Sequence, residues 1–140
     1  MCVLLVLFAY ISHKTNNVTT QAERYDSPEM FRHGEELYLI ARRDPDGVFG
    51  EEEGLLPYSL RAKRTALYRI DRERRAVEWL MDLPGCGDTA FPTVRRLDAH
   101  RFLIANYTSP LDDPEISWIQ AQVSQRGTQI YLSTLTFHPP

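Results

Sequence analysis

Acidic and aromatic side chains of this sequence stand where strand-like segments begin or end. Asp26 precedes Ser27 and Pro28 at the start of one such segment, and Asp88 lies just ahead of another. An acid at a strand entrance could act as the general acid in glycoside cleavage. Tyr107, at the end of a third segment, could be a nucleophile if a neighbouring acid took its proton. These three are therefore the candidate catalytic residues: Asp26, Asp88 and Tyr107.

Each of these three residues also has a purely structural interpretation. Asp26 and Asp88 could hold turns through hydrogen bonds to nearby backbone amides, as aspartates commonly do. Tyr107 could pack at a strand end with its hydroxyl hydrogen-bonded. The two interpretations differ in what they require in space, because a catalytic set must converge on one pocket whereas structural residues can be scattered.

A second group of residues could bind a substrate. Arg42 and Arg43 end a strand-like segment, and a guanidinium can bind a carboxylate through two parallel hydrogen bonds. Neighbouring strand residues face opposite sides, so at most one of these arginines can face a central pocket. The alternative is that both are exposed strand-end residues. Glu29, His13 and Lys14 complete the candidate substrate-binding residues.

The sequence favours neither a metal, nor a cofactor, nor a nucleic-acid partner. It has no Gly-rich phosphate loop, no nucleophile elbow and no metal-spaced histidine pair. Its cysteines, Cys2 and Cys86, are too far apart in the chain to form a zinc-binding pattern. A net charge of −3 gives no general reason to bind nucleic acid. The arginine-rich stretch at 61–75 also contains acidic residues, as the solvated face of a hairpin would.

The chain contains one internal repeat. A shift of 64 residues places Pro28 on Pro92 and the Leu-Ile-Ala triplet at 39–41 on the same triplet at 103–105. A repeat of this length with several strands per unit is typical of β-propeller blades rather than of helical solenoids. Two blades cannot close a ring that usually needs four to eight, so the sequence predicts an incomplete propeller.

The expected fold is all-β, with antiparallel sheets forming two to three blades of an incomplete five- or six-bladed propeller. The chain is expected to be a single partial domain over 1–140, with blade-like units at about 27–83 and 91–137. The strands of the first unit are predicted at 27–32, 37–43, 66–71 and 76–83, with a long loop over 44–64. Those of the second unit are predicted at 91–97, 101–107 and 129–137.

The first eleven residues are nearly all apolar. This run is shorter than the ~20 residues needed to span a bilayer, so no membrane partner is expected. A secretory signal is one interpretation, but there is no basic region before the run and no small-residue cleavage site after it. We interpret 3–11 as a buried strand and 1–23 as the end of a preceding blade. The localisation stays open, and the two cysteines weakly favour a reducing compartment over a secreted one.

Several segments, in their order and spacing, resemble the C-terminal part of bacterial propellers of the sialidase-like and five-bladed glycoside hydrolase group. They are Ser27 to Phe31, Leu37 to Arg43, Gly87 to Pro92, Asn106 to Ser109 and Gln129 to Leu132. The resemblance implies a glycan pocket at the propeller axis, with Asp26 in the acidic position before a small residue and proline. In the sialidase branch it implies arginines for a sialic-acid carboxylate, a tyrosine nucleophile and an aspartic acid/base. The family's Asp-box pattern is not found.

Two functional hypotheses follow. In the first, the parent protein hydrolyses a glycosidic bond, and this chain contributes Asp26, Asp88, Arg42 and Tyr107 to a shared carbohydrate pocket. In the second, the chain is a non-catalytic propeller fragment or binding module without enzyme activity of its own. Both predict self-association through open sheet edges, because unpaired strands invite pairing.

Overall fold

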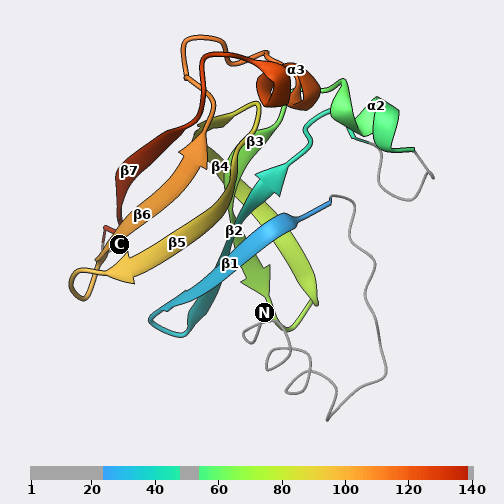
Figure 1. The fold of residues 1–140 in the computed structure, drawn as a ribbon. Helices are drawn as coiled ribbons and strands as arrows, with labels where there is room; N and C mark the ends of the chain where they lie inside the picture. Colours follow the sequence, from blue (N-terminus) through green and yellow to red (C-terminus); the bar gives the residue numbers. More distant parts are fainter. Residues whose placement is uncertain (1–23, 48–53, 139–140) are drawn as a thin grey trace, which may run out of the picture.

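The computed structural model describes residues 24–47 and 54–138, which form two antiparallel sheets and two short helices (Figure 1). The first sheet has the strand order β1-β2-β3-β4 and the second has the order β5-β6-β7. Neither sheet is closed, and the all-β prediction is confirmed at this level. The strands are β1 (Asp26–His33), β2 (Glu36–Arg43), β3 (Arg64–Asp71), β4 (Ala76–Cys86), β5 (Ala90–Arg96), β6 (Arg101–Thr108) and β7 (Gln129–Thr136).

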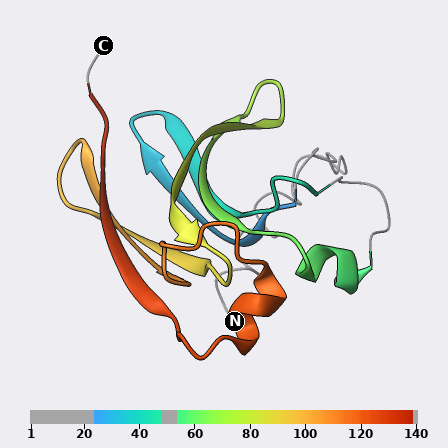
Figure 2. The same ribbon diagram turned by 90° about the horizontal axis from the view of Figure 1, so that it is seen from above.

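The two sheets share an apolar core, which alternating side chains of β2 and β6 supply. Tyr38 and Ile40 are buried on β2, and Phe102 and Ile104 are buried on β6, with both isoleucines fully inaccessible. Phe31 of β1 links the two sheets, since its ring lies 5.4 Å from that of Tyr38 and 5.0 Å from that of Phe102. Period-two burial places these side chains on one face of each sheet. Figure 2 shows the sheets from above, with β1–β4 and β5–β7 on opposite sides of this core.

Aspartate-capped turns close two of the hairpins. In the β3–β4 turn, Asp71 Oδ1 accepts hydrogen bonds from the backbone N–H groups of Glu73 and Arg74. In the β5–β6 turn, Asp98 Oδ1 accepts the corresponding bonds from His100 and Arg101. An aspartate that binds the backbone two residues ahead favours a turn over continued strand. The turns predicted at 72–75 and 98–100 are confirmed.

The internal repeat has a structural counterpart at the entrances of β1 and β5. Ser27 and Phe91, one residue before the two repeated prolines, have φ of 49° and 48°. At the same points the pairing slips, between Asp26 and Glu29 in one hairpin and between Ala90 and Thr93 in the other. The chain therefore makes the same kind of bulge twice, although only one of the two copies begins with an acid.

The two hairpins differ by one residue in length. Met30 pairs with Leu39 in the first hairpin, whereas Val94, 64 residues later, pairs with Ile104 rather than with Leu103. The additional residue lies in the turn, which spans 98–100 in the second hairpin and 34–35 in the first. The 64-residue shift thus aligns the buried positions of β2 and β6, Tyr38 with Phe102 and Ile40 with Ile104, but not the residues that pair with β1 and β5.

A close approach of the backbone joins the two sheets. The connection from β4 to β5 consists of residues 87–89, and just before it Gly85 passes between two threonines. A Cβ at Gly85 would lie 2.2 Å from Thr65 Oγ1 and 2.6 Å from Thr89 Oγ1, so a side chain cannot be placed there without moving its neighbours. The two hydroxyl oxygens are 2.6 Å apart and share a hydrogen bond.

Two short helices lie between the strands. Helix α2 (Leu55–Ser59) interrupts the expected loop over 44–64, and α3 (Trp118–Val123) lies between β6 and β7, where no helix was predicted. α3 starts with a capping box, in which Ser117 and Gln120 satisfy each other's backbone N–H groups. No described helix is long and apolar enough to cross a membrane. The predicted strand at 3–11 and the segment 1–23 lie outside the described residues.

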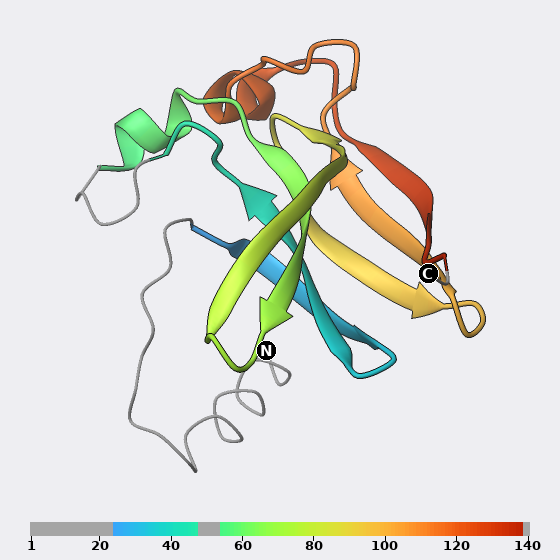
Figure 3. The same ribbon diagram turned by 180° about the vertical axis from the view of Figure 1, so that it is seen from behind.

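Both helices lie at one end of the sheets. Figures 1 and 3 show α2 and α3 together beyond the points where β2 and β6 end, and β1 and β5 begin at this same end. The pairing of Asp26 with Arg42 and of Ala90 with Tyr107 places the start of each first strand beside the end of its partner. This end therefore gathers most of the candidate residues, and the helices supply side chains that cover it.

Candidate functional site

Arg42 lies at the centre of the gathered residues. It pairs with Asp26 across the β1–β2 ladder, and its Nη2 is 3.6 Å from Asp26 Oδ2. Its guanidinium carbon lies 5.9 Å from the ring centres of both Tyr58 on α2 and Trp118 on α3. The side chain is only 14% exposed. Two strands and both helices thus meet around one largely buried cation.

The Asp26 carboxylate is held by three partners. Tyr58 donates its hydroxyl hydrogen to Oδ2 at 2.7 Å, Arg24 donates from Nε to Oδ1 at 2.9 Å, and Arg42 adds its charge. Burial raises the pKa of Asp26, but the hydrogen bonds from Tyr58 and Arg24 and the two positive charges outweigh it and leave the pKa below its usual value. Asp26 is therefore ionised at neutral pH, in the state of a ligand or base.

Tyr107 and Asp88 form a second pair nearby. The Tyr107 hydroxyl donates a hydrogen bond to Asp88 Oδ1 at 3.0 Å, and the Asp88 backbone N–H donates to Ser109 Oγ at 3.1 Å. Burial, followed by the charge and the hydrogen bond of Asp88, raises the pKa of Tyr107 to about 12. The positive charge of Arg42 lowers the pKa values of Tyr107, Tyr58 and Asp26, so it reaches both pairs.

We call this group the Arg42 cluster. Its members are Asp26, Arg42, Tyr58, Asp88, Tyr107 and Trp118. The arrangement places a tyrosine hydroxyl against a carboxylate that can accept its proton, and the positive charge of Arg42 acts on that tyrosine. The predicted residues thus fall into two pairs, Asp26 with Arg42 and Asp88 with Tyr107.

Arg43 does not belong to the Arg42 cluster. Its Nη1 lies 3.4 Å from Asp82 Oδ1, and its guanidinium carbon lies 5.1 Å from the ring of Trp79 on β4. Adjacent residues of a strand face opposite sides, and the sequence-based expectation that at most one arginine would face the site agrees with this arrangement.

The remaining predicted binding residues have different outcomes. Glu29 lies on β1, three residues after Asp26, and pairs with Ile40 of β2. It is half-buried, and burial raises the pKa of its carboxyl. It is not a member of the Arg42 cluster. His13 and Lys14 lie outside the described residues.

Sequence reasoning missed the two aromatic members of the cluster, Tyr58 and Trp118. Tyr58 is fixed in place by a buried lysine, because Lys63 Nζ donates to the Tyr58 carbonyl, lies 4.1 Å from the Tyr58 ring centre and pairs with Asp44 at 3.4 Å. Arg61 binds the same Asp44 carboxylate with two nitrogens. The capping-box pattern Ser117-x-x-Gln120 was a readable signal for α3, whereas the five-residue α2 is too short to show a period.

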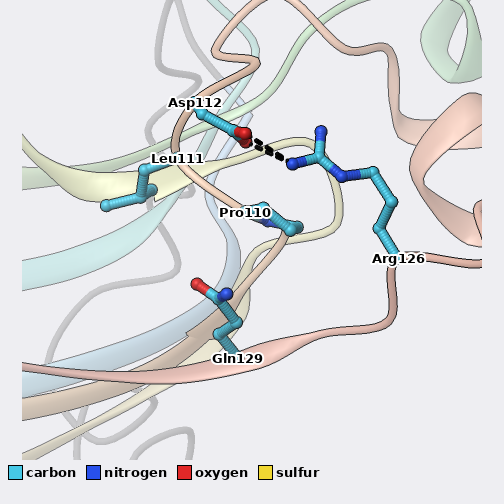
Figure 4. Close-up of a pocket in the computed structure, with 5 residues that line it drawn as sticks. All are labelled: Pro110, Leu111, Asp112, Arg126 and Gln129. Atoms are coloured by element: carbon cyan, nitrogen blue, oxygen red, sulfur yellow. Dashed lines mark hydrogen bonds and ion pairs between the residues drawn. The ribbon is translucent and has the colours of Figure 1, made fainter.

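A shallow hollow lies elsewhere, between the β6–α3 segment and the start of β7. It is lined by Pro110, Leu111, Asp112, Arg126 and Gln129. Figure 4 shows the Asp112 carboxylate facing Arg126 across it, and Arg126 Nη2 donates to both carboxylate oxygens at 2.6 Å. Both charged groups therefore satisfy each other. Within 24–47 and 54–138, no three His, Cys, Asp or Glu side chains are grouped so that they could hold a metal ion.

Comparisons with family models, with curated proteins and with solved structures found no match.

Proposed function

We propose that the chain is part of a β-propeller that resembles the sialidase-like glycoside hydrolases, and that the Arg42 cluster is its glycan pocket. Two features support the propeller. Each sheet is a simple meander in chain order, and β1 and β5 begin with the same bulge at the same end of the molecule. In a propeller, the first strands of successive blades line the axis, where ligands bind.

The hydrogen bond between Tyr107 and Asp88 is the observation that carries the catalytic part of the proposal. Some glycosidases, the sialidases among them, use a tyrosine nucleophile in place of a carboxylate. In the proposed step, Tyr107 Oη attacks the anomeric carbon while its proton passes to Asp88, and the bond to the leaving group breaks. Water then adds to the anomeric carbon and the bond to Tyr107 Oη breaks. The proton of the water restores the Tyr107 hydroxyl, and Asp88 gives its proton to the departed anion. Arg42 binds the carboxylate of an acidic sugar.

Asp26 serves in this proposal as a positioning residue. Its carboxylate is ionised and lies against Arg42, so it orients the guanidinium and does not carry a proton for the leaving group. Phenolic leaving groups need little protonation. The test therefore uses aryl glycosides, which report on the nucleophile without requiring a general acid.

The full chain is assayed for release of the phenol from an aryl N-acetylneuraminide and from an aryl arabinofuranoside. We expect the first to be cleaved, and Tyr107→Phe to lower the rate at least about 100-fold because it removes the nucleophile. Tyr131→Phe, on the neighbouring strand β7, is the matched control and should retain the rate. Equal rates in the two variants would contradict the proposed nucleophile, and failure to bind either sugar would overturn the whole proposal.

A second candidate is a glycan-binding segment without turnover. It is favoured by the protonation states in the cluster, because a tyrosine with a pKa of about 12 and an ionised Asp26 provide neither a ready nucleophile nor an acid. Calorimetry and the phenol assay together separate the two candidates. Binding of N-acetylneuraminic acid in calorimetry, without phenol release from the aryl N-acetylneuraminide, supports the second candidate. Light scattering of the same sample tests self-association.

A further inference from the structure

Two histidines meet at the end of the sheets away from the Arg42 cluster. His33 ends β1, and His100 lies in the turn between β5 and β6, so the two residues belong to different hairpins. His33 Nε2 lies 3.2 Å from His100 Nδ1, and the two nitrogens share a hydrogen bond. Figure 1 shows both hairpin turns at the end of the sheets away from α2 and α3. The pair therefore links the two sheets at the surface.

Phe137 holds both histidines in place. The His33 ring stacks on the Phe137 ring, with the ring centroids 4.1 Å apart and the planes at 14°. The Phe137 backbone N–H donates to the His100 carbonyl at 2.9 Å. His33 also meets the buried ring of Phe102 edge-on at 5.9 Å. Ligands that packing has already positioned lose less freedom when they bind.

The separation of the two ring nitrogens suits two ligands of one metal ion. Zinc binds imidazole nitrogens at about 2.0–2.1 Å, usually in tetrahedral surroundings. At that bond length, nitrogens 3.2 Å apart subtend an angle of about 100° at the metal. The ring centroids are 5.4 Å apart, and turning both lone pairs toward a metal brings them to about 5.0 Å. The pair is exposed, so the rings can turn and water can reach the metal.

The arginines of the two turns are paired within those turns. Arg32 binds the carboxylate of Glu35 next to the β1–β2 turn, and Arg101 binds that of Asp98 in the β5–β6 turn. Because an acid of the same turn neutralises each guanidinium, these arginines oppose a bound cation less than unpaired ones would.

We infer that His33 and His100 bind one divalent transition-metal ion of the zinc class, which fastens the β1–β2 hairpin to the β5–β6 hairpin. Imidazole is the commonest protein ligand for such ions. One of the two facing nitrogens donates to the other in the hydrogen bond. On binding, the donor ring carries its proton on its other nitrogen, so that both facing nitrogens offer lone pairs to the metal. Water supplies the remaining ligands, because no third metal-binding side chain joins the pair within 24–47 and 54–138.

This site is separate from the proposed glycan pocket and could not be recognised from motif spacing. The two histidines are 67 residues apart in the chain and converge only when both hairpins are folded together. A metal that needs both ligands therefore binds the folded chain in preference to the unfolded one and stabilises it.

The test uses the full chain and Zn²⁺ alone. The chain has four histidines, so His13→Gln and His138→Gln are the matched controls for His33→Gln and His100→Gln. In calorimetry, His33→Gln and His100→Gln should each weaken Zn²⁺ binding at least about tenfold, because the ion loses one of two linked ligands. Both controls should retain the wild-type affinity. Absence of Zn²⁺ binding, or an equal loss in the controls, overturns the inference.

Two readouts on the unmodified chain do not depend on how the variants fold. Zn²⁺ should raise the midpoint of thermal unfolding, because it binds the folded chain preferentially. The ring-proton resonances of His33 and His100 should shift together during the titration, while that of His138 stays in place. A midpoint that Zn²⁺ leaves unchanged, or a shift of only one of the two resonances, contradicts a shared metal.

Discussion

The hairpins β1–β2 and β5–β6 share a backbone design but differ in the side chains at their entrances. Both carry a non-glycine residue with positive φ followed by proline, and both slip register at the same point. The first hairpin opens with Asp26 opposite Arg42, whereas the second opens with Ala90 opposite Tyr107. Since Ala90 forms the bulge without a carboxylate, the acid of the first hairpin is not needed to make it.

This difference separates scaffold from site. The bulge, the proline and the positive φ are properties of the repeated backbone, and the charges are added to one copy only. The second copy contributes a hydroxyl through Tyr107, which Asp88 holds from the connection before β5. The first hairpin thus supplies the ionic pair of the Arg42 cluster, Asp26 and Arg42, and the second supplies the phenolic hydroxyl of Tyr107.

The strongest challenge to this comparison is to remove the contact between the hairpins. Ile104→Ala deletes a fully buried side chain from the core that β2 and β6 share, and we expect a loss of about 2–5 kcal/mol in the free energy of unfolding. Urea denaturation followed by both circular dichroism and tryptophan fluorescence should give one coincident, earlier transition. Leu132→Ala, at a side chain that is 61% exposed, is the control and should change little. Two separate transitions would show that the sheets fold independently.

Asp26→Ala makes the entrance of the first hairpin resemble that of the second. We expect a loss of about 1.5–3 kcal/mol at pH 7, because Tyr58 and Arg24 lose a charged acceptor and Arg42 loses its counter-ion. The folded-state pKa of Asp26 is lowered, so its contribution is complete above the unfolded value of about 3.9 and disappears as the pH falls below it.

The midpoint of thermal unfolding, measured for wild type and Asp26→Ala between pH 7 and pH 3, reports this dependence. The gap between the two chains should narrow as the pH falls through 4. A gap that stays constant over this range would mean that the ionised carboxylate does not stabilise the entrance.

The smallest expected effect concerns the positive φ that both hairpins share. Ser27→Gly should stabilise the chain by up to about 1 kcal/mol, since a left-handed backbone costs about that much for a non-glycine residue. Phe91→Gly should gain less, because its ring lies 6.0 Å from that of Tyr107 and this contact is lost. Denaturation midpoints compare the two variants directly, and equal gains would show that the Phe91 ring adds nothing.

Much of the strand content followed from alternation and turn chemistry. The segment 37–43 alternates between the core and the opposite face, and the predicted turn at 72–75 is held by the side chain of Asp71, so both signals are local. The register of the second hairpin could not be predicted from alternation. One residue added in the turn shifts every pairing partner, but it does not change the pattern of buried residues.

The site was predictable only in part, for a related reason. Asp26, Asp88 and Tyr107 stand at strand ends, and strand ends of neighbouring hairpins meet at one edge, so their convergence could be inferred. Tyr58 and Trp118 come from short helices inside segments without periodicity, and their positions depend on Lys63 and Arg61, which look like parts of a solvated charge run. Burial of a lysine through carbonyl contacts has no sequence signature.

The passage of Gly85 between Thr65 and Thr89 has a genetic consequence. Every amino-acid substitution at this position adds at least a Cβ, and that atom would overlap the hydroxyl groups of both threonines. The two threonines share a buried hydrogen bond, so neither can move away without leaving a polar group unsatisfied. Among random variants of this chain, those that still fold with the two sheets joined will keep glycine at position 85, even when residues of the Arg42 cluster are substituted.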